Sequence, residues 1–186
     1  DPTFAYEVVT IIREGMRRMY EAQEDVYYYV TLMNENYPHP GLADAPKGNG
    51  SSTEEGILKG LYKLKAGPKT AASGKGKGLR VQLMGSGTIL REVMAAADLL
   101  QADFGVSADL WSATSYNELR RDGMATERWN LLHPTEPRRK SWVEACLDGH
   151  DGPVIASTDY MRNYADQVRE YVQAAGRRYV VLGTDG

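Results

Sequence analysis

The sequence has little of what disulfide, zinc or nucleophilic chemistry needs. It contains one cysteine, Cys146, so no disulfide can form within the chain, and this usage is typical of a reducing compartment such as the cytoplasm. Apolar residues flank Cys146, which favours a buried, unreactive thiol over a nucleophile. The three histidines, His39, His133 and His150, show no HxxxH or His/Cys spacing, so we expect no metal site.

An excess of one charge and long apolar runs are also missing. The 22 Lys and Arg nearly balance the 25 Asp and Glu, for a net charge of −3, which gives no electrostatic reason to expect nucleic acid. No apolar run approaches the ~20 residues that cross a bilayer, and the acidic start DPTFAYEVV is unlike a signal peptide. The composition is therefore that of an ordinary soluble globular protein without membrane contact.

Nucleotide and hydrolase motifs are weak or absent. There is no GxSxG elbow and no P-loop lysine. Gly85 and Gly87 form a GxG turn between an expected strand and helix, but Leu90 stands where a dinucleotide fingerprint has its third glycine. This pattern favours a tight turn with close helix–sheet packing, although such a helix start can hold an anion. An NAD-dependent oxidoreductase stays an alternative on these two glycines alone.

What the sequence does contain, from residue 79 onward, is a regular alternation of strands and helices. We expect strands at residues 79–84, 108–113, 154–157 and 179–182, with helices between them. Ser115 and Ser141 are each followed three residues later by a glutamate, which predicts helix starts. The alternation predicts an α/β fold whose mostly parallel sheet is covered by helices on both faces.

The first 40 residues predict one helix at 5–21 and one strand at 26–32, which cannot form a core alone. We expect this piece to be the end of a larger domain, or else to pack on the rest of the chain. Residues 41–78 are rich in Gly, Pro and Lys and read as a linker. The linker holds a short helix, GILKGLYKL, that begins after Ser52, and its lysines Lys69, Lys75 and Lys77 are expected in a solvated loop.

The most informative stretch is YYYVTLMNENYPH, residues 27–39, where the expected strand ends in a polar turn. Open α/β sheets place their ligands at the edge where such strands end. The turn therefore provides five candidate residues for a substrate channel: Asn34, Glu35, Asn36, Tyr37 and His39. For His39, a position in a solvent-facing loop is an equal alternative. The 12 tyrosines of the chain favour a large, partly wet interface over a purely internal core.

Six segments in order give the sequence a family resemblance: VYYYVTLMNENY, GILKGLYKL, VQLMGSGTILREV, SYNELRRDG, ERWNLLHP and ASTDYMRNYADQVREYV. Together they resemble the C-terminal third of the bacterial homodimeric pyruvate dehydrogenase first component. The resemblance implies that residues 1–40 end a middle, pyrimidine-type domain and that 41–78 form a linker with a short helix. It also implies that 79–186 are a transketolase-like C-terminal domain, truncated at its end.

The resemblance implies an enzyme that decarboxylates pyruvate on thiamine diphosphate and Mg²⁺. It then reductively acetylates the lipoyl group of the dihydrolipoyl acetyltransferase component, and it works as a cytoplasmic homodimer. The family's cofactor-binding GDG motif and activating glutamate match positions before Asp1. We therefore expect no catalytic, cofactor-binding or metal residue in this segment, which alone should be inactive. Sugar-handling relatives carry a basic residue in the turn for a substrate phosphate, so Glu35 fits a substrate without phosphate. The alternative function is a noncatalytic α/β interaction or regulatory domain.

Overall fold

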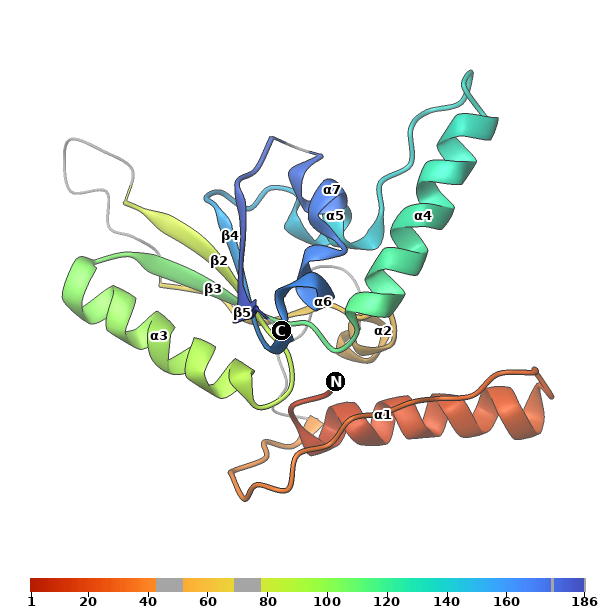
Figure 1. The fold of residues 1–186 in the computed structure, drawn as a ribbon, viewed down its shortest axis with the longest axis horizontal. Coiled ribbons are helices and arrows are strands. Elements are labelled where there is room, and N and C mark those ends of the chain that lie inside the picture. Colours follow the sequence, from red (N-terminus) through yellow and green to blue (C-terminus); the bar gives the residue numbers. More distant parts are fainter. Residues whose placement is uncertain (43–51, 69–77, 175, 186) are drawn as a thin grey trace.

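The computed structural model describes residues 1–42, 52–68, 78–174 and 176–185 (Figure 1). These residues form a sheet with the strand order β1-β3-β2-β4-β5. Its strands are β1 (Tyr62–Lys65), β2 (Arg80–Gly85), β3 (Ser107–Ser112), β4 (Val154–Met161) and β5 (Tyr179–Thr184). Strands β2 to β5 pair in parallel, whereas β1 pairs antiparallel with β3 at one edge. The expected mostly parallel sheet is confirmed.

Helices cover both faces of the sheet (Figure 1). Helix α3 (Ile89–Phe104) packs on one face, where Leu83 of β2 shares a core with Leu90 and Val93. The other face carries α4 (Tyr116–Leu132), α5 (Trp142–Leu147), α6 (Arg162–Asp166) and α7 (Arg169–Gln173), and Met84 joins that core. Because Leu83 and Met84 are adjacent in one strand, their side chains point to opposite faces.

The N-terminal helix is anchored in the core mainly at its beginning. Helix α1 (Ala5–Met16) continues as a single π-helical turn, Arg17–Glu21. Phe4 and Tyr6 are buried in the same core as α3, together with Ile57 of the short helix α2 (Thr53–Leu58). The rest of α1 projects past the sheet (Figure 1) and leaves Val9 and Ile12 exposed.

The strand expected at residues 26–32 is wrong: this segment has no strand assignment and runs back along α1 (Figure 1). Its burial still alternates, since Tyr27 and Tyr29 are exposed while Tyr28 between them is half-buried. The Tyr28 ring packs on Gly15, where an added Cβ would lie 3.2 Å from it. The physical reason is that a strand needs a neighbour for its backbone hydrogen bonds, and the described residues supply none here.

Two helix expectations also need correction. The helix over GILKGLYKL ends at Leu58, because Gly60 (φ +94°) turns the chain into β1. An added Cβ at Gly60 would lie 2.4 Å from the Ser115 carbonyl oxygen, so the turn is fitted tightly to the start of α4. The single helix expected between the strands at 154–157 and 179–182 is two short helices, α6 and α7, and β4 extends to Met161.

Three helix starts were predicted correctly. Ser52, Ser115 and Ser141 each accept a hydrogen bond from the backbone N–H three residues later. Helix α4 continues from Tyr116 to Leu132. Lys69, Lys75 and Lys77 lie outside the described residues.

Candidate functional site

A buried carboxylate, that of Glu7, joins the N-terminal segment to the sheet. Its Oε1 accepts hydrogen bonds from the Tyr62 hydroxyl (2.6 Å) and the Ser112 hydroxyl (2.7 Å). Its Oε2 accepts from the backbone N–H groups of Thr3 and Phe4. The side chain is fully buried, and burying a carboxylate is costly unless its oxygens are hydrogen-bonded. The four donors therefore fix α1 against β1 and β3.

Two tyrosines extend this network. The hydroxyls of Tyr6 and Tyr62 are 2.5 Å apart, and Tyr62 donates to Glu7. Burial raises the pKa of Tyr6 to about 12, and burial together with the negative charge of Glu7 raises the pKa of Tyr62. Both hydroxyls therefore stay protonated and able to donate at physiological pH. Sequence reasoning missed Glu7, although a glutamate in the first turn of a helix is a recognisable signal.

The predicted turn lies against the beginning of α1. The Tyr37 hydroxyl donates a hydrogen bond to the Thr3 carbonyl oxygen, and the Ala5 N–H donates to His39 Nδ1 at 3.1 Å. The rings of Tyr37 and His39 are in contact, with their centres 4.4 Å apart. The segment that Glu7 holds is thus the same segment that holds these two candidates.

The contact with Ala5 fixes the chemistry of His39. An Nδ1 atom that accepts a backbone hydrogen bond carries no proton, so the neutral ring carries its proton on Nε2. The side chain is exposed. His39 therefore presents an N–H donor to whatever lies beside the turn.

The C-terminal unit contributes Arg91 to the turn. Arg91 Nη1 lies 3.1 Å from Glu35 Oε2, and the guanidinium carbon lies 4.7 Å from the centre of the Tyr37 ring. Arg91 is in the first turn of α3, just beyond the carboxyl end of β2. The turn therefore lies near the carboxyl edge of this sheet, held by α1 and α3 and not by a strand of its own.

The structure thus brings together three of the five predicted site residues, Glu35, Tyr37 and His39. Asn34 and Asn36 are exposed. Burial raises the pKa of Tyr37, and the nearby Arg91 opposes that shift. Arg91 was not predicted as a site residue, because its position gives no local signal and only the fold brings it to residue 35.

The GxG turn between β2 and α3 is a packing feature. An added Cβ at Gly85 would lie 2.8 Å from Leu90 Cα, and one at Gly87 would lie 2.7 Å from Asp1 Oδ1. The Gly87 N–H also donates to the Asp1 carbonyl oxygen at 3.0 Å, and Thr3 Oγ1 donates to the Gly87 carbonyl. The packing interpretation is confirmed, and the N-terminal segment occupies the place that a dinucleotide would need.

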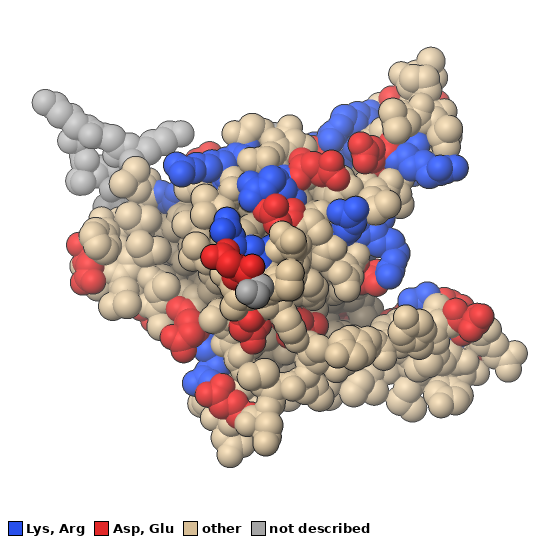
Figure 2. Space-filling view, viewed as in Figure 1, with Lys and Arg blue, Asp and Glu red and all other residues tan. Residues whose placement is uncertain are grey.

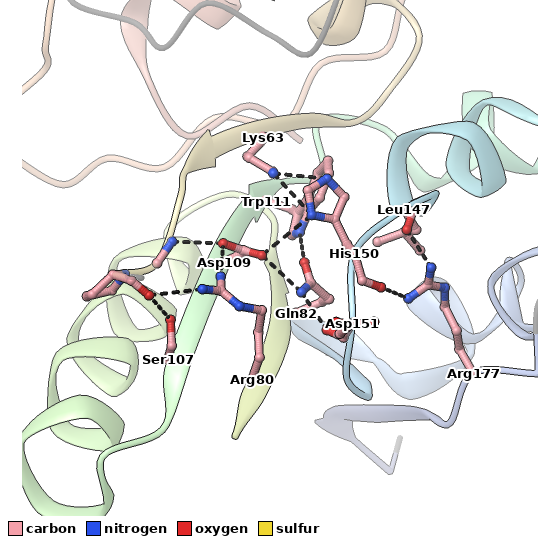
Figure 3. Close-up of polar contacts among 12 residues, drawn as sticks. Lys63, Arg80, Gln82, Ser107, Asp109, Trp111, Leu147, His150, Asp151 and Arg177 are labelled. Atoms are coloured by element: carbon pink, nitrogen blue, oxygen red, sulfur yellow. Dashed lines mark hydrogen bonds and ion pairs between the residues drawn. The ribbon is translucent and has the colours of Figure 1, made fainter. Parts of the chain in front are cut away.

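A second polar cluster lies at the opposite, amino end of the strands (Figure 3). The buried carboxylate of Asp109 accepts hydrogen bonds from Arg80 (2.7 Å), Gln82 (3.0 Å) and the Gly67 N–H (2.8 Å). Burial opposes the ionisation of Asp109, but these hydrogen bonds outweigh it and lower the pKa of the carboxyl group. Gln82 Oε1 in turn accepts from the Trp111 indole N–H at 2.9 Å.

His150 covers this cluster. Its Nδ1 lies 3.6 Å from Asp109, Lys63 Nζ lies 3.0 Å from its Nε2, and its ring meets Trp111 edge-on. Burial, and then the positive charge of Lys63, lower the pKa of His150. The cluster faces away from the turn at residues 34–39, so we assign it to the stability of the sheet.

The described residues give no indication of thiol chemistry, a metal-ion cluster or a membrane-spanning helix. Cys146 is half-buried, and burial raises the pKa of its thiol to about 12, which disfavours the reactive thiolate form. Within the part of the chain that the structure describes, no group of three or more His, Cys, Asp or Glu side chains is arranged to hold a metal ion. No helix among those residues is long and apolar enough to cross a membrane.

Comparisons with known proteins divide the chain in two. Residues 60–186 match the family described as the transketolase-like TK C-terminal domain, and residues 1–40 match the pyruvate dehydrogenase E1 component middle domain. Pyruvate dehydrogenase E1 components of Pseudomonas aeruginosa, Cupriavidus necator and Escherichia coli K12 are 57%, 54% and 51% identical to the chain. Each alignment covers 100% of this chain but 19% of the relative, so the chain spans about a fifth of the length of these relatives.

The Glu7 network predicts a large effect of a small change. Glu7→Gln keeps the size of the side chain, but the amide nitrogen cannot accept a hydrogen bond. The buried donors that face that nitrogen therefore lose their acceptor. We expect the free energy of unfolding to fall by about 2–4 kcal/mol, measured by urea denaturation. Glu21→Gln, at an exposed position of the same helical segment, is the matched control. An unchanged urea midpoint for Glu7→Gln contradicts this account of the network.

The position of His150 predicts how stability depends on pH. Its pKa is lowered in the folded protein, so the unfolded chain binds a proton more readily, and stability falls as pH drops below the ordinary value of 6.5. Titrating groups facing the ring are Lys63, Asp109, Arg80 and Arg177. We expect His150→Gln to reduce this fall, as measured by thermal unfolding between about pH 7.5 and pH 5. His133→Gln, on the exposed end of α4, should retain it; equal profiles for the two variants would refute the role of His150.

Proposed function

The chain belongs to the transketolase-like C-terminal domain family, and we propose that it is a working part of a pyruvate dehydrogenase E1 component. The proposed enzyme decarboxylates pyruvate and reductively acetylates the lipoyl group of a dihydrolipoyl acetyltransferase. The observation that carries the proposal is the alignment of every residue, in both pieces of the chain, with E1 components. The N-terminal segment packs against the GxG turn, which argues against a dinucleotide-binding enzyme. No observation favours a noncatalytic interaction domain.

We propose the following division of labour. Residues 1–40 complete a middle domain, residues 79–186 form the C-terminal domain, and residues 41–78 connect the two. Strand β1 lies within the connecting stretch and adds an edge strand to the sheet of the C-terminal domain. Glu7 holds the two domains together through its contacts with Tyr62 and Ser112. The enzyme works in the cytoplasm, in keeping with a chain that has a single cysteine.

The exposed apolar side of residues 1–40 supports docking to the remainder of a middle domain. Val9, Ile12, Met16 and Tyr20 recur every three or four residues and are 51–75% exposed. The extended backbone of residues 26–30 lies beside α1 with the rings of Tyr27 and Tyr29 exposed. Figure 2 shows that the side of the molecule formed by this helix is mostly uncharged on the face drawn. Burying each of these side chains stabilises the assembly by about 1.5–3 kcal/mol. A neighbouring strand with apolar residues around it could pair with the extended backbone and cover these side chains. We propose that this assembly is completed in a homodimer.

At the turn, the chain's own residues suit a small anionic 2-oxo acid. His39 presents its Nε2–H, while the Tyr37 hydroxyl is engaged by Thr3 and the Glu35 carboxylate by Arg91. A carboxylate or carbonyl oxygen of pyruvate is an acceptor that the His39 donor can bind. Residues 34–37 carry no basic side chain, and Arg91 beside them is already paired with Glu35, so the turn offers little to a substrate phosphate.

The described residues do not fit a site for thiamine diphosphate and Mg²⁺. They offer no cluster of acidic ligands, and the start of α3 is covered by the side chain of Asp1. We propose that parts of the enzyme outside this chain hold the cofactor, whose thiazolium ring supplies the electron sink for decarboxylation. This chain contributes the shape and the hydrogen bonding of the substrate side.

An assay of the complete enzyme tests the function. We expect it to acetylate a lipoyl domain in a reaction that requires pyruvate, and His39→Ala to lower kcat/KM for pyruvate by about tenfold or more, since a hydrogen bond to a charged group is lost. His133→Ala, just after the end of α4, serves as the control. A complete enzyme that leaves the lipoyl domain unmodified would rule out the proposal.

Docking is tested separately with Ile12→Glu. Ile12 is 51% exposed, so the isolated chain should unfold at an unchanged temperature. In the complete enzyme the carboxylate would be buried without a partner, and we expect at least about a tenfold loss of correctly assembled enzyme in size-exclusion chromatography. Ala96→Glu, exposed on α3, is the control for an added surface charge. Normal assembly of the Ile12 variant would show that this face is not covered.

A further inference from the structure

We propose that Arg91 is a positioning residue of the C-terminal domain, which holds the substrate-facing turn in place and neutralises Glu35. The inference rests on the proposed function, because it assumes that the turn meets an anionic 2-oxo acid. It assigns to the C-terminal domain a direct part in preparing the site.

The backbone of Arg91 is fixed by its neighbours. Leu90 is fully buried and Val93 is 5% exposed, so both sides of the first turn of α3 are anchored in the core. From this anchored position the guanidinium group reaches residues 35 and 37, which are more than 50 positions earlier in the sequence. A flexible surface arginine has no such constraint.

One guanidinium group makes two different contacts. Its Nη1 pairs with Glu35 Oε2 at 3.1 Å, and its carbon lies 4.7 Å from the Tyr37 ring centre. A planar, delocalised cation can form an ion pair and a cation–π contact together, which a lysine ammonium does less well. Arg91 therefore constrains both the carboxylate and the aromatic ring.

The constraint reaches His39 through Tyr37. The Tyr37 and His39 ring centres are 4.4 Å apart, and both residues are hydrogen-bonded to the segment before α1, at Thr3 and Ala5. The turn is thus held by α1 at one side and by Arg91 at the other. Removing Arg91 takes away one of the contacts that hold the Tyr37 ring, and through that ring it changes the surroundings of His39.

Charge neutralisation is the second part of the role. The side chains of Arg91 and Glu35 are 36% and 53% exposed, so solvent screens the pair and its effect is moderate. Without Arg91, the Glu35 carboxylate would stand uncompensated beside the path of an anionic substrate. An exposed pair of this kind changes an equilibrium by about two- to fivefold.

Steady-state kinetics of the complete enzyme test the proposal. We expect Arg91→Gln to raise KM for pyruvate about two- to fivefold with a smaller change in kcat, because substrate binding is weakened by an uncompensated charge. Arg91→Lys should restore most of the charge effect. In the Glu35→Gln background, Arg91→Gln should change KM much less, since there is no charge left to neutralise. Arg121→Gln, which removes an exposed ion pair with Glu118 on α4, is the matched control.

A structural measurement on the 186-residue chain separates two kinds of failure. In ¹⁵N NMR, Arg91→Gln should shift the ring nitrogen signals of His39, and Arg121→Gln should leave them in place. If His39 and Glu35 variants alter KM but Arg91→Gln matches Arg121→Gln in both measurements, the role of Arg91 is refuted and the proposed function stands. If Arg91→Gln shifts the His39 signals while His39→Ala leaves pyruvate kinetics unchanged, the turn does not meet substrate, and the role of Arg91 in the site is refuted. The proposed function is then still decided by the lipoyl-domain assay alone.

Discussion

The structure depends on one buried carboxylate. Glu7 accepts hydrogen bonds from two hydroxyls that belong to the sheet and from two backbone N–H groups that precede α1. A charge without water is tolerated only when its oxygens are satisfied in this way, so the relative position of helix and sheet is closely specified. The turn at residues 34–39 is hydrogen-bonded to the same segment, so its position relative to the sheet is also closely specified.

Much of the fold follows from local patterns in the sequence. Alternating strands and helices predicted the parallel sheet, and the serine caps at Ser115 and Ser141 marked helix starts to the residue, because both signals depend on neighbours within a few positions. The GxG turn was likewise interpreted correctly as a packing feature. The strand at residues 26–32 failed because pairing needs a partner that no local pattern can supply.

The site could be predicted only in part. A polar turn after an apolar run indicated Glu35, Tyr37 and His39, and the structure brings these three together. The position of Glu7 in the first turn of a helix marks it as a capping residue but not as a contact of the sheet. Arg91 looks like an ordinary surface residue of an amphipathic helix. Their roles come from contacts with residues distant in the chain, Ser112 for Glu7 and Glu35 for Arg91.

The extended segment beside α1 also has a consequence for handling the protein. Residues 26–30 combine an extended backbone with exposed tyrosine rings on alternate positions. An open backbone edge of this kind is a template for any other extended chain, including an identical one. Concentrated preparations of the chain by itself are therefore prone to edge-to-edge association, and a solubilising lysine at one of these tyrosines is the natural remedy.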